Sequence, residues 1–194
     1  MTRWLALAAA LWLLAPPAWA KLDLVKVINF SCGHCRASEG IDAPIQSAIE
    51  KSGGKFVFAT MPASENTARE LYYYTLRDAY PGLEPAARRA LFEGAQDAAQ
   101  VFGSAPELTV WLSTRLTDPS VNWDWLTANA SRPASRQALG RAINLILQSG
   151  AHSLPSYILI KDGKILRAFD FSPQSSYAEL RDQVLAEIQA QSPK

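Results

Sequence analysis

Apolar residues, several of them β-branched, dominate the segment 22–30, which contains neither glycine nor proline. Such a run is typical of a strand that is buried on both faces of a sheet. After a short polar turn, apolar residues recur at the spacing of a helix, at Ile41, Ile45, Ala48 and Ile49. The segment 55–62 then has strand character again. We therefore expect a β-α-β unit with parallel strands and a right-handed connection.

Pro44 interrupts this helical pattern. A proline inside a continuous helix removes a backbone hydrogen bond and clashes with the preceding turn. Gly40 and Asp42, which stand just before Pro44, are suited to end one helix and to cap the next. We expect a kink or a break at this point.

The middle of the chain, from residue 64 to residue 148, lacks the strand signal and has one helical pattern after another. Prolines and capping residues separate five patterns, which cover residues 64–80, 84–102, 104–116, 118–126 and 133–150. Ser104 and Asp118 are the expected N-caps of two of them, and Pro119 would take a first helical position. Gly150 suits a left-handed C-terminal cap. Because the helices stand between two sets of strands, they indicate an inserted helical subdomain.

Strand character returns in the last part of the chain, at residues 156–160 and 165–171. Asp162-Gly163 between these two runs is a strong hairpin signal, because a type I′ turn needs positive φ at both central positions. These strands should be antiparallel. An amphipathic helix at residues 176–190 should then cover the sheet with the apolar side chains of Leu180, Val184, Leu185 and Ile188.

The first twenty residues have the pattern of an export signal. Arg3 supplies the positive start, residues 4–14 the apolar middle, and Ala18-Trp19-Ala20 an A-x-A cleavage pattern. The apolar run is shorter than the roughly 20 residues that a membrane-spanning helix needs. We expect cleavage before Lys21, which leaves 174 of the 194 residues, enough for one domain with an insertion.

Charge and cysteine content narrow the class of protein. The whole chain has nineteen basic and eighteen acidic residues. Removal of Arg3 with the export signal leaves eighteen of each, so the mature chain has no net charge. This balance does not suggest a nucleic-acid-binding protein. The chain has only two cysteines, whereas small domains held together by disulfides carry many. A bridge between Cys32 and Cys35 would close a very short loop and stabilise the fold little. The pair is therefore expected to serve chemistry.

The sequence Cys32-Gly33-His34-Cys35 lies where the first strand leads into a helix. Free backbone N–H groups and the positive end of the helix dipole would favour the thiolate of Cys32, which is the nucleophilic form. Cys35 follows one turn later and should face inward, so that Cys32 is the exposed attacking sulfur and Cys35 the shielded one.

His34 adds to this effect, because an imidazolium beside Cys32 also favours a charged sulfur. Lowering a thiol pKa from about 8.5 to about 4.5 corresponds to about 5 kcal/mol in favour of the thiolate. That energy stabilises the reduced protein, so its disulfide becomes an oxidant. Gly33-His34 is thus expected to decide the direction in which the pair transfers electrons.

A Cys-x-x-Cys pair can also bind a metal or form an inert bridge. A zinc site would need two more ligands, and His34 and His152 are the only histidines. Iron–sulfur ligation needs four cysteines. An inert bridge is the remaining alternative. We favour redox catalysis by the Cys32–Cys35 disulfide itself, with no metal and no separate cofactor.

Leu154-Pro155 stands directly before the strand at residue 156, where a proline without an N–H is suited to a first or edge position. With this element, the order of strand, Cys-Gly-His-Cys, helix, strand, helical insertion, x-Pro, hairpin and helix resembles the DsbA-like branch of the thioredoxin superfamily. The resemblance implies an α/β fold, thioredoxin-like with a central mixed sheet, in which residues 21–63 and 150–194 form the main domain and residues 64–149 the helical insertion. It also implies that Pro155 is cis and that Leu154 and Pro155 contact the substrate beside the disulfide.

The same resemblance implies a periplasmic, monomeric protein thiol–disulfide oxidase that acts on exported proteins containing cysteine. Its reoxidation partner would be a DsbB-like membrane quinone reductase. The Cys-Gly-His-Cys motif matches disulfide isomerases rather than the Cys-Pro-His-Cys of well-known oxidases, so a reductase or isomerase is an alternative. With only about ten residues between Lys21 and the cysteines, we expect no amino-terminal dimerisation domain, as periplasmic isomerases have. A peptide-binding module or chaperone without catalysis is the alternative from another class.

Two further groups could belong to the site. Aromatic residues of the middle segment could line a substrate groove, but at helical spacing they are more often core: Tyr72, Tyr73, Tyr74, Trp111, Trp123 and Trp125. His152 is close to Pro155 in sequence, but loop histidines are mostly solvated. We interpret the aromatic residues as core and His152 as a surface residue.

Overall fold

Residues 21–192 are described in the computed structural model of the chain, so the predicted export signal lies outside the described residues. Their sheet has the strand order β2-β1-β3-β4. The strands are β1 (Leu22–Ile28), β2 (Phe56–Thr60), β3 (Ser156–Lys161) and β4 (Lys164–Asp170). β1 pairs in parallel with β2 and antiparallel with β3, and β3 pairs antiparallel with β4. The predicted mixed sheet is confirmed.

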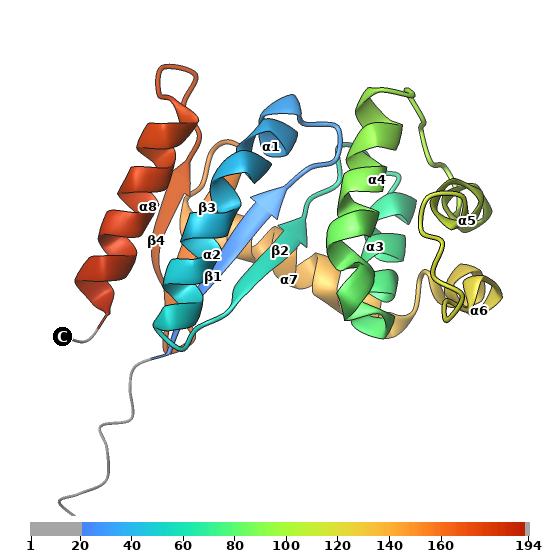
Figure 1. Cartoon of the computed structure of the whole chain (residues 1–194), viewed down its shortest axis with the longest axis horizontal. Coiled ribbons are helices and arrows are strands. Elements are labelled where there is room, and N and C mark those ends of the chain that lie inside the picture. The colour runs from blue at the N-terminus through green and yellow to red at the C-terminus, as the bar shows by residue number, and fades with distance from the viewer. Residues whose placement is uncertain (1–20, 193–194) are drawn as a thin grey trace, which may run out of the picture.

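Helices cover both faces of the sheet and extend beyond its β2 edge. Figure 1 shows α2 and α8 in front of the sheet, α7 behind it, and α3 to α6 beside it. The helices are α1 (Gly33–Ala37), α2 (Asp42–Lys51), α3 (Ala68–Ala79), α4 (Glu84–Gln96), α5 (Ala105–Ser113), α6 (Trp123–Asn129), α7 (Pro133–Ser149) and α8 (Tyr177–Gln191). The five helices predicted between the second and third strands are α3 to α7.

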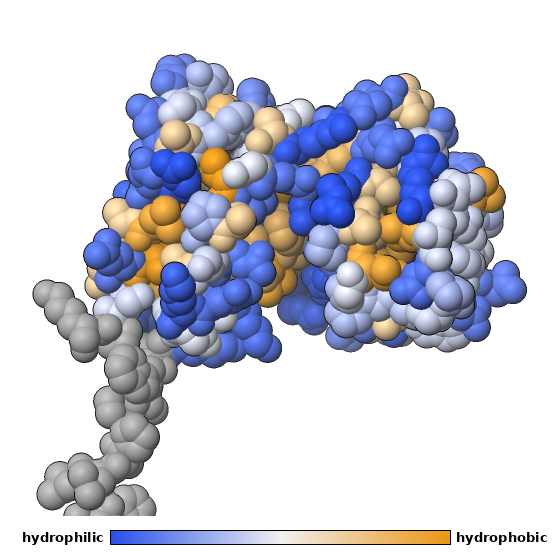
Figure 2. All heavy atoms as spheres, viewed as in Figure 1, coloured by the Kyte–Doolittle hydropathy of each residue, from blue (hydrophilic) through white to orange (hydrophobic). Residues whose placement is uncertain are grey.

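Alternation along β1 divides the interior into two apolar clusters. Leu22 and Leu24 pack with α2 and α8 on the front face, in a cluster that we call the front core. Val27 and the helices α3 to α7 contribute to a second, larger cluster, the insertion core. Hydrophilic residues cover most of the solvent-facing surface in Figure 2, as expected for amphipathic helices.

Several local predictions are confirmed. A 3₁₀ turn, Ser38–Ile41, separates α1 from α2, so the helix does break just before Pro44. Asp162 and Gly163 both have positive φ, as a type I′ hairpin turn requires. Gly150 ends α7 in the left-handed conformation. α8 buries Leu180, Val184 and Ile188 on one side.

The predicted start of the fourth helix of the insertion is wrong. α6 begins at Trp123, and its N-cap is Asn122, whose side-chain oxygen accepts a hydrogen bond from the Trp125 N–H. Asp118 instead accepts hydrogen bonds from the N–H and the hydroxyl of Ser120. Its side chain therefore closes a local turn, a conformation that competes with helix capping.

The helix predicted at residues 84–102 ends early, at Gln96. In the loop that follows, Ala99 and Phe102 both have positive φ, which no helix allows. Phe102 is almost completely buried and packs edge-on against Trp111. Gly94 makes room for this packing, because a Cβ at that position would lie 2.3 Å from the Phe102 ring. Tertiary packing of one aromatic side chain thus overrides the helical pattern.

Side chains of α3 cover the outer edge of β2, the edge that faces away from β1. The Tyr74 hydroxyl accepts from the Thr60 N–H at 2.8 Å and donates to the Thr60 carbonyl at 3.2 Å. Arg77 donates to the Phe58 carbonyl at 3.1 Å. These contacts satisfy edge groups that could otherwise pair with another chain, and they attach the insertion to the sheet.

Candidate active site

Cys32 lies at the carboxyl end of β1, in the turn that leads into α1. The Asn29 side chain holds this turn: its carbonyl oxygen accepts from the Ser31 N–H at 2.7 Å, and its amide donates to the Met61 carbonyl at 2.8 Å. The Cys32 N–H also donates to the Asn29 carbonyl. Cys32 is the N-cap of α1, and its Sγ accepts from the Cys35 N–H at 3.2 Å. The strand-to-helix junction therefore fixes the sulfur at the start of the helix.

The two cysteines have opposite electrostatic environments. Cys32 is partly exposed, and a hydrogen bond from the Cys35 thiol, with the N–H groups of Cys35 and His34, lowers its pKa to about 6. Cys35 is completely buried. Its hydrogen bond to Cys32 and its burial raise the Cys35 pKa well above the ordinary value. Near neutral pH, Cys32 is therefore mostly a thiolate and Cys35 a thiol.

The main cause of this difference is not the one that the sequence suggested. We expected the helix start and the His34 charge to act on Cys32, but the Cys35 thiol has the largest effect and the His34 charge the smallest of those that lower the pKa. α1 is only five residues long, so its dipole is weak. The asymmetry between the cysteines is thus mostly a property of the pair itself.

His34 is held by residues from the end of the chain. Its Nδ1 lies 2.9 Å from the Tyr177 hydroxyl, and its ring lies 4.6 Å, centre to centre, from the Phe171 ring. Phe171 in turn stacks on Tyr177. Gly33, the other residue between the cysteines, is exposed, and a Cβ there would meet no atom within 4 Å. The His34 ring is therefore oriented, whereas position 33 is open.

The Leu154-Pro155 segment reaches Cys32 through the Leu154 carbonyl. The peptide bond between them is cis, which confirms the expectation from the resemblance. The Leu154 carbonyl oxygen is 3.7 Å from Cys32 Sγ, so the thiol can donate to it. The Pro155 carbonyl accepts from the Phe171 N–H, which joins this segment to the residues around His34.

A buried ion pair near Cys35 was not predicted. Lys26 is fully buried on β1 and donates to both carboxylate oxygens of Asp42, at 2.9 and 2.7 Å. The Tyr157 hydroxyl donates to the same carboxylate at 2.7 Å. Burial lowers the Lys26 pKa and raises the Asp42 pKa, and the Lys26 charge favours the thiolate of Cys35. The available signal was a lysine within the apolar run 24–28 of β1.

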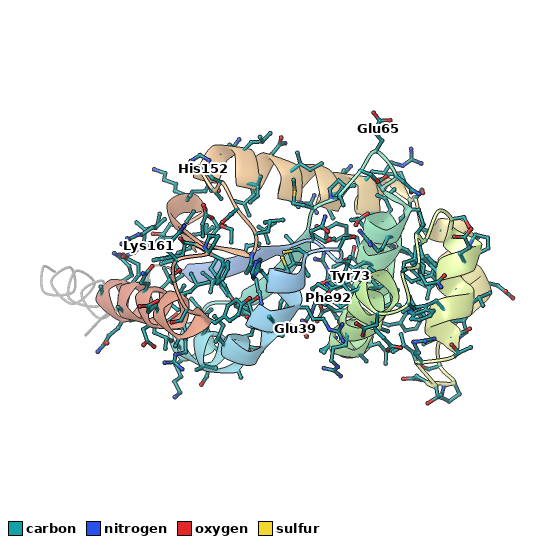
Figure 3. All side chains as sticks on the ribbon, turned by 90° about the horizontal axis from the view of Figure 1, so that it is seen from above. Glu39, Glu65, Tyr73, Phe92, His152 and Lys161 are labelled. Carbon is teal, nitrogen blue, oxygen red and sulfur yellow. The ribbon has the colours of Figure 1, made fainter. Side chains whose placement is uncertain are left out.

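The helical insertion also contacts the cysteine segment, which the sequence did not reveal. Gln96, the last residue of α4, donates to the carbonyls of Phe30 and Cys32, at 2.9 and 3.2 Å. Arg36 pairs with Asp97 at 2.7 Å. On the side of α4 that faces the sheet, Arg88 pairs with Glu39. Figure 3 shows Glu39 near Tyr73 and Phe92 in this view. The insertion therefore helps to position both ends of the segment that carries the cysteines.

The other candidate groups fall where we interpreted them, with the exception of Trp125. Tyr72, Tyr73 and Tyr74 are buried in the insertion core, which confirms their interpretation as core residues. Trp111 and Trp123 are partly buried against the same core, and Trp125 is more exposed. His152 is exposed on the loop after α7, and in Figure 3 it lies far from Tyr73 and Phe92.

Residues 21–192 contain neither a cluster of metal ligands nor a helix suited to cross a membrane. Within that range, no group of three or more His, Cys, Asp or Glu side chains is placed to hold a metal ion. None of the helices described there is long and apolar enough to cross a membrane.

No protein-family model and no curated protein sequence matches this chain. Several solved structures match it. DsbA from Pseudomonas aeruginosa matches with a TM-score of 0.69 and 19% identity, over 93% of this chain and 89% of that one. The oxidoreductase NmDsbA1 from N. meningitidis matches with a TM-score of 0.64 and 13% identity, over 88% and 84%. BdbD from Bacillus subtilis matches with a TM-score of 0.61 and 16% identity, over 87% and 88%.

These structures cover nearly the whole of the described chain, both the sheet with its helices and the insertion. At identities below 20%, the match concerns the path of the backbone. The chain therefore has the DsbA-like fold, a thioredoxin-like domain with a helical insertion, and carries its cysteine pair where β1 leads into α1.

Proposed function

We propose that this protein is an exported thiol–disulfide oxidoreductase, and that it acts as an oxidase that donates the Cys32–Cys35 disulfide to cysteine-containing proteins. The observation that carries the proposal is the asymmetry of the two sulfurs. Cys32 is accessible with a lowered pKa, and Cys35 is buried with a raised one. An accessible sulfur that leaves readily beside a protected partner is what disulfide transfer needs.

The transfer proceeds in two exchanges. A substrate thiolate attacks Cys32 Sγ, the Cys32–Cys35 bond breaks, and Cys35 departs with the electron pair and takes up a proton, which its raised pKa favours. A second substrate thiolate then attacks the substrate sulfur of the mixed disulfide and releases Cys32 as a thiolate. The substrate loses two electrons and gains a disulfide, and the protein is left reduced. No separate cofactor takes part.

The site residues have distinct roles in this proposal. The low pKa of Cys32 makes it a good leaving group in the second exchange. The Leu154 carbonyl and Pro155 form the wall against which a substrate segment lies. His34, which stands between the two cysteines in the chain, is held in orientation by Tyr177. Gly33 leaves the approach open.

Three further features belong to the proposal. The protein would work as a monomer in the periplasm after removal of residues 1–20. A DsbB-like membrane quinone reductase would restore its disulfide. The monomeric state and the DsbB-like partner follow from the resemblance, and the periplasmic location follows from the resemblance and from the leader pattern of the sequence.

Equilibration of the protein with glutathione buffers tests the direction of transfer. An oxidase should have a reduction potential above about −200 mV. A potential at or below the cytosolic poise, roughly −220 to −260 mV by extraction methods, would contradict the oxidase and favour the reductase or isomerase that Cys-Gly-His-Cys resembles. A variant with both cysteines replaced by serine distinguishes the oxidoreductase from a peptide-binding module or chaperone without catalysis, because a chaperone would keep its activity.

A further inference from the structure

A hollow of about 350 Å³ opens beside Ser31, between the turn after β1 and the insertion. Ser31, the residue before Cys32, forms part of its wall. The hollow has two other walls. One is the start of α3 with the preceding loop, which contributes Ala63, Ser64, Asn66 and Arg69. The other is the end of α4 with the loop that follows it, which contributes Ala95, Ala99, Gln100, Val101 and Phe102. Its volume is at the low end of the range for small ligand sites, about 300–1,000 Å³. It is large enough for a side chain with its own backbone.

Arg69 is the only charged residue among those that line the hollow. Its side chain is 10% exposed, and its guanidinium is anchored on the inner side by Glu70, which both Nε and Nη2 contact at 3.0 Å. Nη1 reaches towards the Cys32 turn and donates to the Ser31 hydroxyl at 3.3 Å. Because a guanidinium has five N–H groups, two remain for a ligand.

The hollow differs from its surroundings in charge. Glu107, on the next helix, is engaged by the Gly103 N–H at 2.8 Å. Glu65, on the loop before α3, points outward into solvent in Figure 3 and does not line the hollow. Ser31, Asn66 and Gln100 add neutral polar groups to the wall, and Val101, which is 83% exposed, adds an apolar rim. A carboxylate with an apolar stem matches this combination.

We propose that this hollow is a substrate subsite that takes an acidic side chain, Asp or Glu, placed within about two residues of the cysteine that reacts with Cys32. The distance follows from Ser31, which borders both the hollow and Cys32, since an extended chain advances about 3.3 Å per residue. The Arg69 guanidinium binds the carboxylate through its two remaining N–H groups. This inference rests on the proposed function and adds a sequence preference to it.

Rates with short peptides test the preference. The oxidised wild-type protein is mixed with peptides that carry one cysteine and either Glu or Gln at positions −2 to +2, and each rate is divided by the thiolate fraction of that peptide. At one position, Glu should react about tenfold faster than Gln, the size expected for a hydrogen-bonded charged group. A ratio below about twofold at every position would overturn the subsite and leave the proposed function intact. If no cysteine peptide reacts, the proposed function itself fails.

Variants connect the preference with Arg69. Arg69→Gln combined with Glu70→Gln removes both charges of the buried pair at once, so the net charge is unchanged and no carboxylate is left buried alone. The ratio of Glu to Gln rates should fall to near one. Arg89→Gln, which removes an exposed arginine of α4 outside the hollow, should keep the wild-type ratio. A double variant that keeps the preference would contradict the role of Arg69.

A second measurement does not depend on the folding of the double variant. The Glu peptide is joined to Cys32 in a Cys35→Ala protein as a stable mixed disulfide, and the structure of the adduct is determined. We expect its carboxylate within hydrogen-bond distance of the Arg69 guanidinium. A carboxylate placed elsewhere, or in solvent, would overturn the proposal.

Discussion

The front core and the surroundings of the cysteines are built from different interactions. In the front core, Leu24, Ile45 and Val184 are completely buried among other apolar side chains. Around the cysteine segment, polar and directional contacts are added to apolar packing: Gln96 holds two carbonyls, Arg36 pairs with Asp97, and Lys26 pairs with Asp42.

This difference separates stability from chemistry. Apolar burial is proportional to area and has no direction, so it stabilises the sheet without fixing the position of one sulfur. Hydrogen bonds and ion pairs depend on distance and angle, so they can fix the cysteine turn, and they are costly when one partner is removed. We expect changes in the front core to alter unfolding and changes near Cys32 to alter reactivity.

Cys32→Ser should separate the two properties most completely. Oxidation of a reduced substrate protein should fall to the uncatalysed rate, because serine cannot form the mixed disulfide. The free energy of unfolding, measured by denaturation of the reduced proteins below about pH 5, where Cys32 is uncharged in both states, should change little, since Cys32 is only partly buried. A Cys32→Ser variant that still oxidises substrate would show that the chemistry lies elsewhere.

Asp42→Asn is a polar change that should act on stability, and it therefore tests the limits of the comparison. It leaves the fully buried Lys26 without a counter-charge, which should cost about 3–5 kcal/mol of unfolding free energy at pH 7. Replacing both residues, as in Lys26→Met with Asp42→Leu, should recover part of that loss, because no charge is then left alone. If the double variant is less stable than Asp42→Asn, the pair itself contributes net stability.

Ile45→Ala represents the front core. Ile45 is completely buried on α2, so its truncation should lower the free energy of unfolding by about 2–5 kcal/mol. The rate of disulfide transfer per folded molecule should stay at the wild-type value. A rate that falls in parallel would mean that the front core also positions the cysteines.

The pH dependence of Cys32 gives a test without mutation. In the reduced protein, alkylation of Cys32 should rise with pH around a midpoint of about 6 and level off above it. Because the folded pKa is depressed, the thiolate contributes stability that is complete above the unfolded pKa of about 8.5 and is lost as pH falls through about 6. The stability difference between the reduced protein and Cys32→Ser should change in the same window. An alkylation midpoint near 8.5 would contradict the asymmetry of the sulfurs.

Gln96→Ala should lower the free energy of unfolding less than Asp42→Asn or Ile45→Ala, and it should have a measurable effect on the rate of disulfide transfer. It removes two hydrogen bonds to the cysteine turn, at about 0.5–1.5 kcal/mol each. Disulfide transfer should slow several-fold, since the turn that presents Cys32 loses its contact with the insertion. Gln46→Ala, an exposed glutamine of α2, is the matched control and should leave both quantities unchanged. Equal rates in the two variants would show that the insertion does not position the site.

Local patterns in the sequence were sufficient for much of the fold. The hairpin follows from Asp162-Gly163, the break before Pro44 from the chemistry of proline, and the end of α7 from Gly150. The prediction was wrong where another contact competed with the helical pattern. α4 stops at Gln96 because Phe102 packs against Gly94, and α6 starts at Trp123 because Asp118 bonds to Ser120.

The sequence by itself determined the strands and helices, the cysteine pair and the Leu154-Pro155 element, because each depends on residues close together in the chain. Only the tertiary structure decided which groups act on those cysteines. Lys26 meets Asp42 across 16 positions, Gln96 meets Phe30 across 66, and His34 meets Tyr177 across 143. Such contacts have no local pattern, since they exist only once the sheet, the insertion and the last helix have packed around the same turn.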